Sequence, residues 1–183
     1  MIRPPEHFET ARLSARPPQV EDAPAVLAAY AADAEVTRYL SWRPYQAVEP
    51  LADFLQERVR SWETGQGNFA WLLCPKGTEE PIGSIGCTIE GGSVMFGYVL
   101  GRRHWGRGLM PEALGHLVGW ALAQPEIFRA WAFCDAENAA SVRVMEKTGM
   151  CREGTLRRWH LCPNLGPEPR DCIVCSKVRR AAA

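Results

Sequence analysis

The chain has 183 residues, of which 46% are apolar and 23% are charged, and this composition excludes intrinsic disorder. Its 21 basic residues balance its 21 acidic residues, which argues against a protein that binds nucleic acid through charge alone. The length fits one domain over residues 1–183, with a core expected over about 8–180.

Apolar periodicity and turn residues divide the chain into alternating strands and helices. Strands are expected over residues 12–16, 68–74, 82–89, 93–100, 127–135, 154–161 and 172–178. Helices are expected over residues 21–34, 51–62, 109–123 and 138–148. Turn residues separate the three strands in the middle of the chain, which predicts an antiparallel meander. The elements together predict a mixed α/β fold on a central, mostly antiparallel sheet, with a proline-rich surface loop at 163–169.

A glycine-rich loop, Arg103-His104-Trp105-Gly106-Arg107-Gly108, lies between the strand at 93–100 and the helix at 109–123. A helix N-terminus offers unpaired N–H groups and a partial positive charge, and glycines let the backbone approach phosphate oxygens closely. Arginines within the loop add positive charge. This arrangement predicts a pyrophosphate-binding loop, although a plain strand-to-helix turn with solvated arginines remains open.

Two other phosphate-binding motifs do not fit this loop. The dinucleotide fingerprint requires a third glycine where Pro111 stands, and it normally opens a parallel βαβ unit. The nucleoside-triphosphate P-loop requires Lys followed by Ser or Thr, where this chain has Arg107 and Gly108. Neither a dinucleotide nor a nucleoside triphosphate is therefore the expected ligand.

The pattern Arg103-x-x-Gly106-x-Gly108 resembles the acyl-CoA signature of the GNAT N-acetyltransferases. A later stretch, Asp135-x-x-Asn138-x-x-Ser141 with Glu146-Lys147-Thr148-Gly149-Met150, resembles the branch of ribosomal-protein-alanine N-acetyltransferases (RimJ/RimL-like). The expected order of elements agrees with this family from about residue 12 to residue 178. The resemblance implies the GNAT fold, in which the fourth and fifth strands splay apart and helices flank the sheet.

The resemblance also implies that acetyl-CoA is the cosubstrate and that no metal takes part. Pantetheine would bind along the fourth strand, where Gly97 predicts a bulge or a close backbone approach. The implied cofactor-binding residues are Tyr98, Val99, Leu100, Arg103, His104, Trp105, Gly106, Arg107, Gly108 and Asn138.

Two residues are candidate catalytic residues on the same resemblance. Ser141 matches a serine that lies close to the thioester sulfur in this branch, where it would give a hydrogen bond or proton to the thiolate. Asn138 would orient pantetheine or the acceptor. Asn is also a preferred N-cap residue, and Ser141 fits the first turn of a helix, so purely structural roles remain open for both.

At the position of the family's usual general base, this chain departs from the family pattern. Many relatives carry a glutamate on the fourth strand two residues before the glycine, and this chain has Met95 there. A thioether cannot accept the proton of the amine. The remaining candidates are Glu90, Asp135, His160 and a water molecule.

The expected function is direct transfer of an acetyl group from acetyl-CoA to a primary amine, with a protein N-terminus as one acceptor. A small-molecule amine or an antibiotic is the alternative acceptor, and a CoA-binding module without turnover is the alternative from another class. Trp42 and Tyr45 occupy the region that walls the acceptor site in the family. We expect a monomer or homodimer that contacts neither nucleic acid nor membrane directly.

Seven cysteines at scattered positions, mostly in apolar stretches, predict free buried thiols in a cytoplasmic protein. The N-terminus also lacks the apolar core of a signal peptide. His160, Cys162, Cys172 and Cys175 are four candidate zinc ligands, but residues three apart on one strand face opposite sides, so buried cysteines are the better interpretation.

Charge is divided unevenly along the chain. Residues 1–100 hold 8 basic and 13 acidic residues, whereas residues 101–183 hold 13 basic and 8 acidic ones. This division predicts a basic cofactor side that faces an acidic acceptor side.

Overall fold

The computed structural model describes residues 2–179, so residue 180 of the expected core and the alanine tail lie outside the described part. Eight strands form one sheet in the order β1-β2-β3-β4-β5-β6-β8-β7. The β5–β6 pair is parallel and every other neighbouring pair is antiparallel, which confirms the mostly antiparallel sheet. The strands are β1 (Phe8–Glu9), β2 (Leu13–Arg16), β3 (Asn68–Pro75), β4 (Gly83–Glu90), β5 (Ser93–Leu100), β6 (Arg129–Asp135), β7 (Cys151–Leu161) and β8 (Pro169–Val178).

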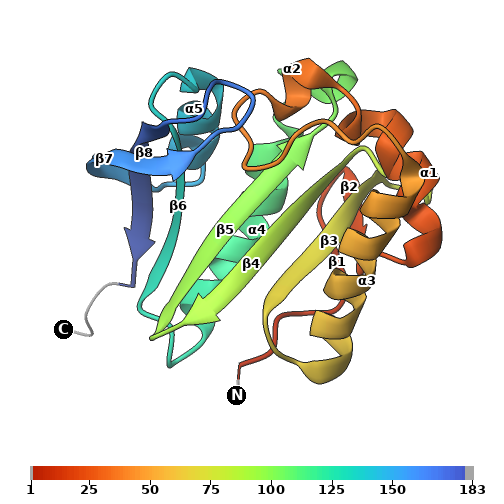
Figure 1. Cartoon of the computed structure of the whole chain (residues 1–183). Coiled ribbons are helices and arrows are strands. Elements are labelled where there is room, and N and C mark those ends of the chain that lie inside the picture. The colour runs from red at the N-terminus through yellow and green to blue at the C-terminus, as the bar shows by residue number, and fades with distance from the viewer. Residues whose placement is uncertain (1, 180–183) are drawn as a thin grey trace.

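Helices cover both faces of this sheet (Figure 1). The helices are α1 (Ala23–Val26), α2 (Ala34–Thr37), α3 (Val48–Thr64), α4 (Leu109–Ala123) and α5 (Ala139–Lys147). α4 lies behind β4 and β5 in Figure 1, whereas α1 and α3 lie on the opposite face. Among residues 2–179, no helix combines the length and the apolar character needed to cross a membrane.

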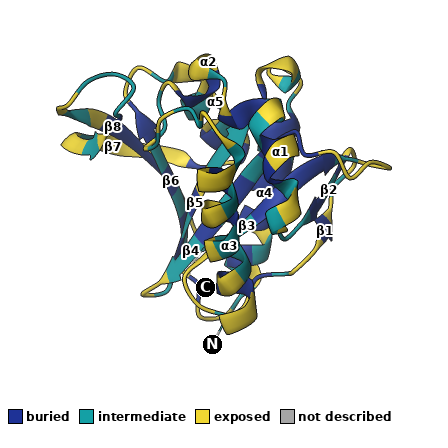
Figure 2. Cartoon of the chain, turned by 45° about the vertical axis from the view of Figure 1, so that its right-hand side comes forward, coloured by how far each residue is buried: buried dark blue, intermediate teal, exposed yellow. Residues whose placement is uncertain are grey.

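The alternation of side chains along β3 creates a separate core on each face. Trp71 and Leu73 point into the larger core, which contains α4, while Leu72 between them points into the smaller core under α1 and α3. Figure 2 shows the buried residues gathered in the strands and on the inner faces of the helices. α4 alone contributes seven buried residues to the sheet, so this helix holds the preceding loop in a fixed place.

The helix expected over 21–34 is confirmed as far as residue 31, but it is irregular and does not continue to residue 34. A 3₁₀ turn (Val20–Asp22), α1 and a π-helical turn (Leu27–Ala31) follow one another, and the chain then restarts as α2. Asp33 causes the restart, because its side chain accepts a hydrogen bond from the Glu35 N–H and caps the new helix.

α3 begins at Val48 rather than at residue 51. The prediction placed the start after Pro50, but a proline in the first turn breaks no helical hydrogen bond because the N–H there would be unpaired. At the other end, Gly65 ends the helix in the left-handed conformation with φ of 69°, which glycine adopts readily.

Candidate active site

β5 and β6 diverge, and a gap opens in the middle of the sheet. The two strands pair only from Ser93–Met95 to Arg129–Trp131, after which β6 stays paired with β8 as far as Asp135. Within residues 2–179, the β6-facing edge of β5 has no strand partner beyond Met95. Figure 1 shows the two strands separating from the β4–β5 hairpin toward α5. This is the splay between the fourth and fifth predicted strands.

Gly97 does not form a bulge in β5. It pairs in register with Gly86 of β4, and the register continues without a shift from Ser93 to Leu100. A Cβ added at Gly97 would meet no atom within 4 Å, so this position faces open space. The glycine therefore leaves room beside the gap without deforming the strand.

Tyr98 of β5 reaches across to the start of α5. Its hydroxyl lies 2.8 Å from the Ser141 hydroxyl and donates to the Ser141 carbonyl at 3.2 Å. Burial raises the pKa of the Tyr98 phenol, and the hydrogen bond with Ser141 only partly opposes that rise. Tyr98 therefore stays protonated at neutral pH and can donate. Only its backbone was expected in the site, and the sequence held no signal for this side-chain contact.

Asn138 is the N-cap of α5. Its side-chain oxygen accepts a hydrogen bond from the Ser141 N–H at 3.1 Å, which fixes the first turn and places the serine beside Tyr98. Asn138 therefore has the helix-capping role that the sequence left open. A contact of Asn138 with cofactor or acceptor stays a prediction.

The glycine-rich loop follows β5 directly and leads into α4. Gly106 and Gly108 have φ of 73° and 74°, a conformation that residues with a side chain rarely adopt. The N–H groups of His104 and Trp105 bond within a local turn, to the carbonyls of Gly101 and Arg102. Within the described chain, no hydrogen-bond partner is found for the N–H groups of Gly106, Arg107 and Gly108, so these three remain for a ligand.

Arg12, the residue just before β2, supports the loop. Its guanidinium donates to the Arg107 carbonyl at 2.8 Å and to the Glu112 carboxylate in the first turn of α4 at 2.7 Å. In the part of the chain that the structure describes, Arg103 and Arg107 form no ion pair. Burial and the adjacent Arg107 cation lower the pKa of His104, so the imidazole is neutral at pH 7. The loop therefore presents two free guanidinium groups beside unpaired N–H groups.

The indole of Trp105 packs back on the end of β5. Its N–H donates to the Leu100 carbonyl at 2.6 Å, so this carbonyl already has a protein partner. Val99 lines a cavity beside the gap, and Tyr98 does so as well. The edge of β5 thus connects the loop with this cavity.

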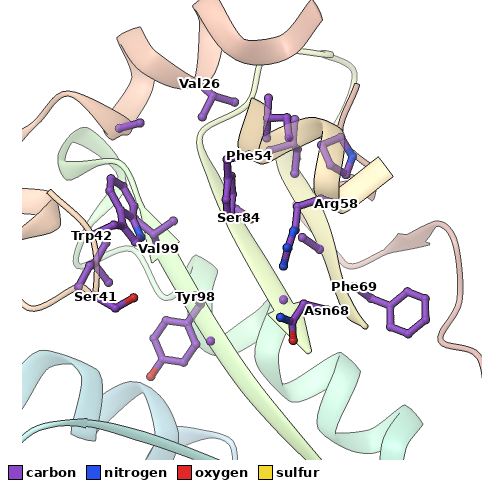
Figure 3. A pocket seen from close by; sticks show the side chains of 18 of the residues that line it. Val26, Ser41, Trp42, Phe54, Arg58, Asn68, Phe69, Ser84, Tyr98 and Val99 are labelled. Atoms are coloured by element: carbon purple, nitrogen blue, oxygen red, sulfur yellow. The ribbon is translucent and has the colours of Figure 1, made fainter. Parts of the chain in front are cut away.

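The cavity has a volume of about 340 Å³ and lies between α3, the α1 region and the face of β3, β4 and β5 (Figure 3). Trp42 and Tyr45 line it with their rings 5.4 Å apart, and Met95 lines it at the position where the family often has its glutamate. Its lining contains no Asp, Glu or His within residues 2–179, and Arg58 of α3 is its charged side chain. Among the described residues the lining itself therefore holds no acidic group, and an acidic acceptor side around the mouth of the cavity stays a prediction.

Sequence reasoning also missed Arg58. This residue lies three positions after Leu55 and four after Phe54, both on the apolar face of α3. That spacing places it on the face that turns toward the sheet, and this was the available signal.

Two of the candidate bases lie away from the cavity. Glu90 ends β4 at the hairpin and is exposed, about four strand residues or roughly 13 Å beyond the level of Gly97. Asp135 is buried in an ion pair with Arg170, with Nε and Oδ2 2.5 Å apart, so its carboxylate is already engaged. Neither fits the role of general base.

His160 remains a candidate. Its ring makes an edge contact with the ring of Phe133 of β6 at 5.1 Å, and burial lowers its pKa, so the ring is neutral at pH 7. It does not line the cavity, so a water molecule would have to carry the proton to it. His160 and water therefore stay predictions.

All seven cysteines are free, and all except Cys151 are buried. Among the described residues, no three His, Cys, Asp or Glu side chains come together as a metal-binding group. Burial raises the pKa of the Cys134 thiol beside Ser141 to about 12, so this residue is a poor nucleophile at neutral pH.

Residues 12–151 match the family model described as an acetyltransferase (GNAT) domain. The uncharacterized N-acetyltransferase p20 of Bacillus licheniformis is 34% identical, over 83% of this chain and 86% of its own. A GNAT-family acetyltransferase from Bacillus anthracis superimposes with a TM-score of 0.79 at 24% identity, over 94% of this chain and 98% of the other. RimL, a ribosomal L7/L12 alpha-N-protein acetyltransferase solved with coenzyme A, superimposes with a TM-score of 0.82 at 18% identity, over 95% and 98%.

The sheet with its central gap, the glycine-rich loop and these similarities agree with one another. The family model covers most of the chain. The relative p20 aligns with 83% of this chain, at 34% identity. The chain therefore belongs to the GNAT family of N-acetyltransferases.

Proposed function

We propose that this enzyme binds acetyl-CoA in the gap between β5 and β6 and transfers the acetyl group directly to a primary amine held in the adjacent cavity. One observation carries this proposal. The unpaired edge of β5 runs from the cavity, which Tyr98 and Val99 line, to the glycine-rich loop that follows Leu100. A ligand with an extended arm and a pyrophosphate can follow this edge along its whole length.

The residues present fit such a ligand at both ends. The N–H groups of Gly106, Arg107 and Gly108 would hold the pyrophosphate at the N-terminus of α4, with Arg103 and Arg107 adding charge. Open backbone groups of β5 would bind pantetheine as an added strand binds a sheet edge. Tyr98 supplies these groups, whereas the backbone groups of Val99 face Ser84 of β4 and the Leu100 carbonyl is used by Trp105.

Ser141 would act on the sulfur that leaves. In this reaction the amine nitrogen bonds to the acetyl carbon, the carbon–sulfur bond breaks, and the sulfur receives a proton. The Ser141 hydroxyl donates that proton and is reprotonated by solvent water, while the Tyr98 hydroxyl 2.8 Å away holds the serine in place. The proton lost by the amine passes to water or, through water, to His160.

The acceptor amine has to be neutral when it attacks. The cavity offers it no carboxylate within the described residues, so an amine with a low pKa suits the site. The α-amino group has a pKa of about 7.7 to 8.0, compared with about 10.4 for lysine. We therefore propose an α-amine as the acceptor, at a protein N-terminus or on a small molecule.

Mass spectrometry tests this function directly. Purified protein is incubated with acetyl-CoA and a panel of peptides, amino acids and small amines, and a mass increase of one acetyl group is sought. In parallel, acetyl-CoA at about 100 times its Kd should raise the free energy of unfolding by about 2.7 kcal/mol. No stabilisation by CoA or acetyl-CoA, together with no acetylated product, would refute the proposal.

A further inference from the structure

Arg58 is a half-buried cation whose Nε–H has no hydrogen-bond partner within residues 2–179. Its side chain is 15% exposed, and its Nε atom is fully buried. One terminal nitrogen contacts Glu57 at 3.1 Å, but that carboxylate is 64% exposed and belongs to the preceding residue. A buried N–H without an acceptor is unfavourable, which indicates a partner that the protein itself does not supply.

The direction of the side chain shows where such a partner would lie. Figure 3 shows Arg58 extending from α3 into the cavity, toward Asn68 of β3. The ring of Phe54, with its centroid 5.0 Å from the guanidinium carbon, packs against the group from its own helix. The guanidinium group of Arg58 is thus held facing the cavity that is proposed to bind the acceptor.

The rest of the cavity is uncharged. The titratable lining residues other than Arg58 are Tyr30, Tyr45, Tyr98 and Cys87, and burial raises the pKa of each, so all four are neutral at pH 7. The lining of the cavity therefore carries one positive charge over an aromatic and aliphatic wall, and the exposed Glu57 carboxylate that contacts it lies outside the lining. Such a lining repels an ammonium ion and attracts an anion, and the planar guanidinium matches a carboxylate in particular.

We propose that Arg58 binds a carboxylate of the acceptor, so that the enzyme acetylates small amino acids or related amino-carboxylic acids with an apolar body. This inference rests on the proposed function, since it assigns the acceptor of the same site. The apolar body lies against Trp42, Tyr45 and Phe54, the carboxylate bonds to Arg58, and the amine faces the gap between β5 and β6.

Matched pairs of acceptors test the assignment. Phenylalanine and leucine are each compared with their carboxamides by initial rates at saturating acetyl-CoA, at a pH above the pKa of both amines, because a neighbouring carboxylate raises the pKa of an α-amine. We expect the acids to have a kcat/KM at least 10-fold above that of the amides. Arg58→Gln should lower kcat/KM for the acids by about 10- to 100-fold and that for the amides much less, because only the acids lose a hydrogen bond between charged groups. Arg60→Gln, which alters an exposed arginine of the same helix outside the cavity, should change neither.

Binding of the N-acetylated products to the CoA-loaded protein gives a second readout that needs no turnover. Calorimetry should show N-acetylphenylalanine binding more tightly than its amide, with the difference lost in Arg58→Gln and partly kept in Arg58→Lys. Equal binding of acid and amide, a preference for the amide, or an equal loss of both in Arg58→Gln would overturn the assignment. A peptide with an acidic second residue as the preferred acceptor would also overturn it. Failure of the proposed function is seen separately, as absence of stabilisation by acetyl-CoA.

Discussion

The hydroxyl of Tyr98 lies 2.8 Å from the hydroxyl of Ser141, and this contact joins β5 to α5 across the gap in the sheet. Its two residues come from segments 43 positions apart. The serine is held from its other side by the Asn138 cap. Ser141 is therefore positioned by both walls of the gap, as a proton donor to a ligand in that gap needs to be.

This contact predicts how single and double variants compare. Ser141→Ala should lower kcat by about 100-fold, a typical contribution of a positioned proton donor, with little change in the KM for acetyl-CoA. Tyr98→Phe should lower kcat less. The double variant should be no slower than Ser141→Ala alone, because Tyr98 acts through the serine. Steady-state rates with the amine found by mass spectrometry measure this, and multiplicative losses would contradict it.

The loop glycines give a prediction about backbone conformation. A Cβ added at Gly106 would meet open space, so Gly106→Ala has only the strain of its φ of 73°, which costs about 1 kcal/mol of unfolding free energy. Acetyl-CoA should also bind less tightly, since the strain is relieved by moving the N–H groups that face the ligand.

Gly119→Ala is the matched control for the loop. Gly119 lies inside α4, and a Cβ there also meets open space. This variant should gain about 0.5 to 1 kcal/mol in helix stability without a change in the Kd for acetyl-CoA. Urea unfolding and calorimetry measure both quantities. An unchanged Kd in Gly106→Ala would remove the loop from the binding site.

Trp42 is predicted to bind the acceptor. It lines the cavity against Tyr45 and is only partly buried, so Trp42→Ala should raise the acceptor KM about 10-fold while the Kd for acetyl-CoA stays the same. Equal weakening of both ligands, or a lower melting temperature alone, would assign the ring to the core instead.

Glu153 predicts a dependence of stability on pH. Hydrogen bonds from Arg129 and then Ser176 lower its pKa to about 2. A folded-state pKa below the unfolded value gives stability that is present above about pH 4.5 and is lost as the pH falls toward 2. Because Glu153 is 41% exposed, the effect should stay below about 1 kcal/mol.

Glu153→Gln should abolish that dependence. Urea unfolding at pH 7 and pH 3 should show a larger loss of stability in the natural sequence than in this variant. The same loss in both proteins would show that the Arg129 pair does not stabilise the fold.

The sequence predicted most elements because each has a local signal. The α4 prediction matched at both ends, since Gly108 precedes a mostly apolar stretch with helical spacing. β1 was missed because two residues carry no periodicity, and Phe8 is recognised as core only through its contacts with Trp71 and His116. Family similarity further favours an enzyme over a CoA-binding module without turnover, a choice that Met95 alone left open.

Of the site, only the features that local sequence motifs specify could be predicted. The loop at 103–108 and the cap at Asn138 follow from residue types at fixed spacings. The partners of Asp135 and the side-chain position of Tyr98 depend on strand register between distant segments, which no local pattern specifies. For that reason Asp135 remained a candidate base until its pairing with Arg170 was seen.

The three-residue pairing of β5 with β6 has a consequence for aggregation. An unpaired strand edge favours aggregation because a strand of another chain can pair with it. At the outer edges of a sheet, proteins prevent this by covering the edge strand or by placing charged side chains on it. Here the open edge lies inside the sheet, with β6 and β8 standing beside it. A strand of another chain carries side chains and would need a place nearly 5 Å from β5, whereas a narrow ligand arm needs less room. The position of the gap therefore disfavours the addition of a strand from another chain, although the edge of β5 is unpaired there.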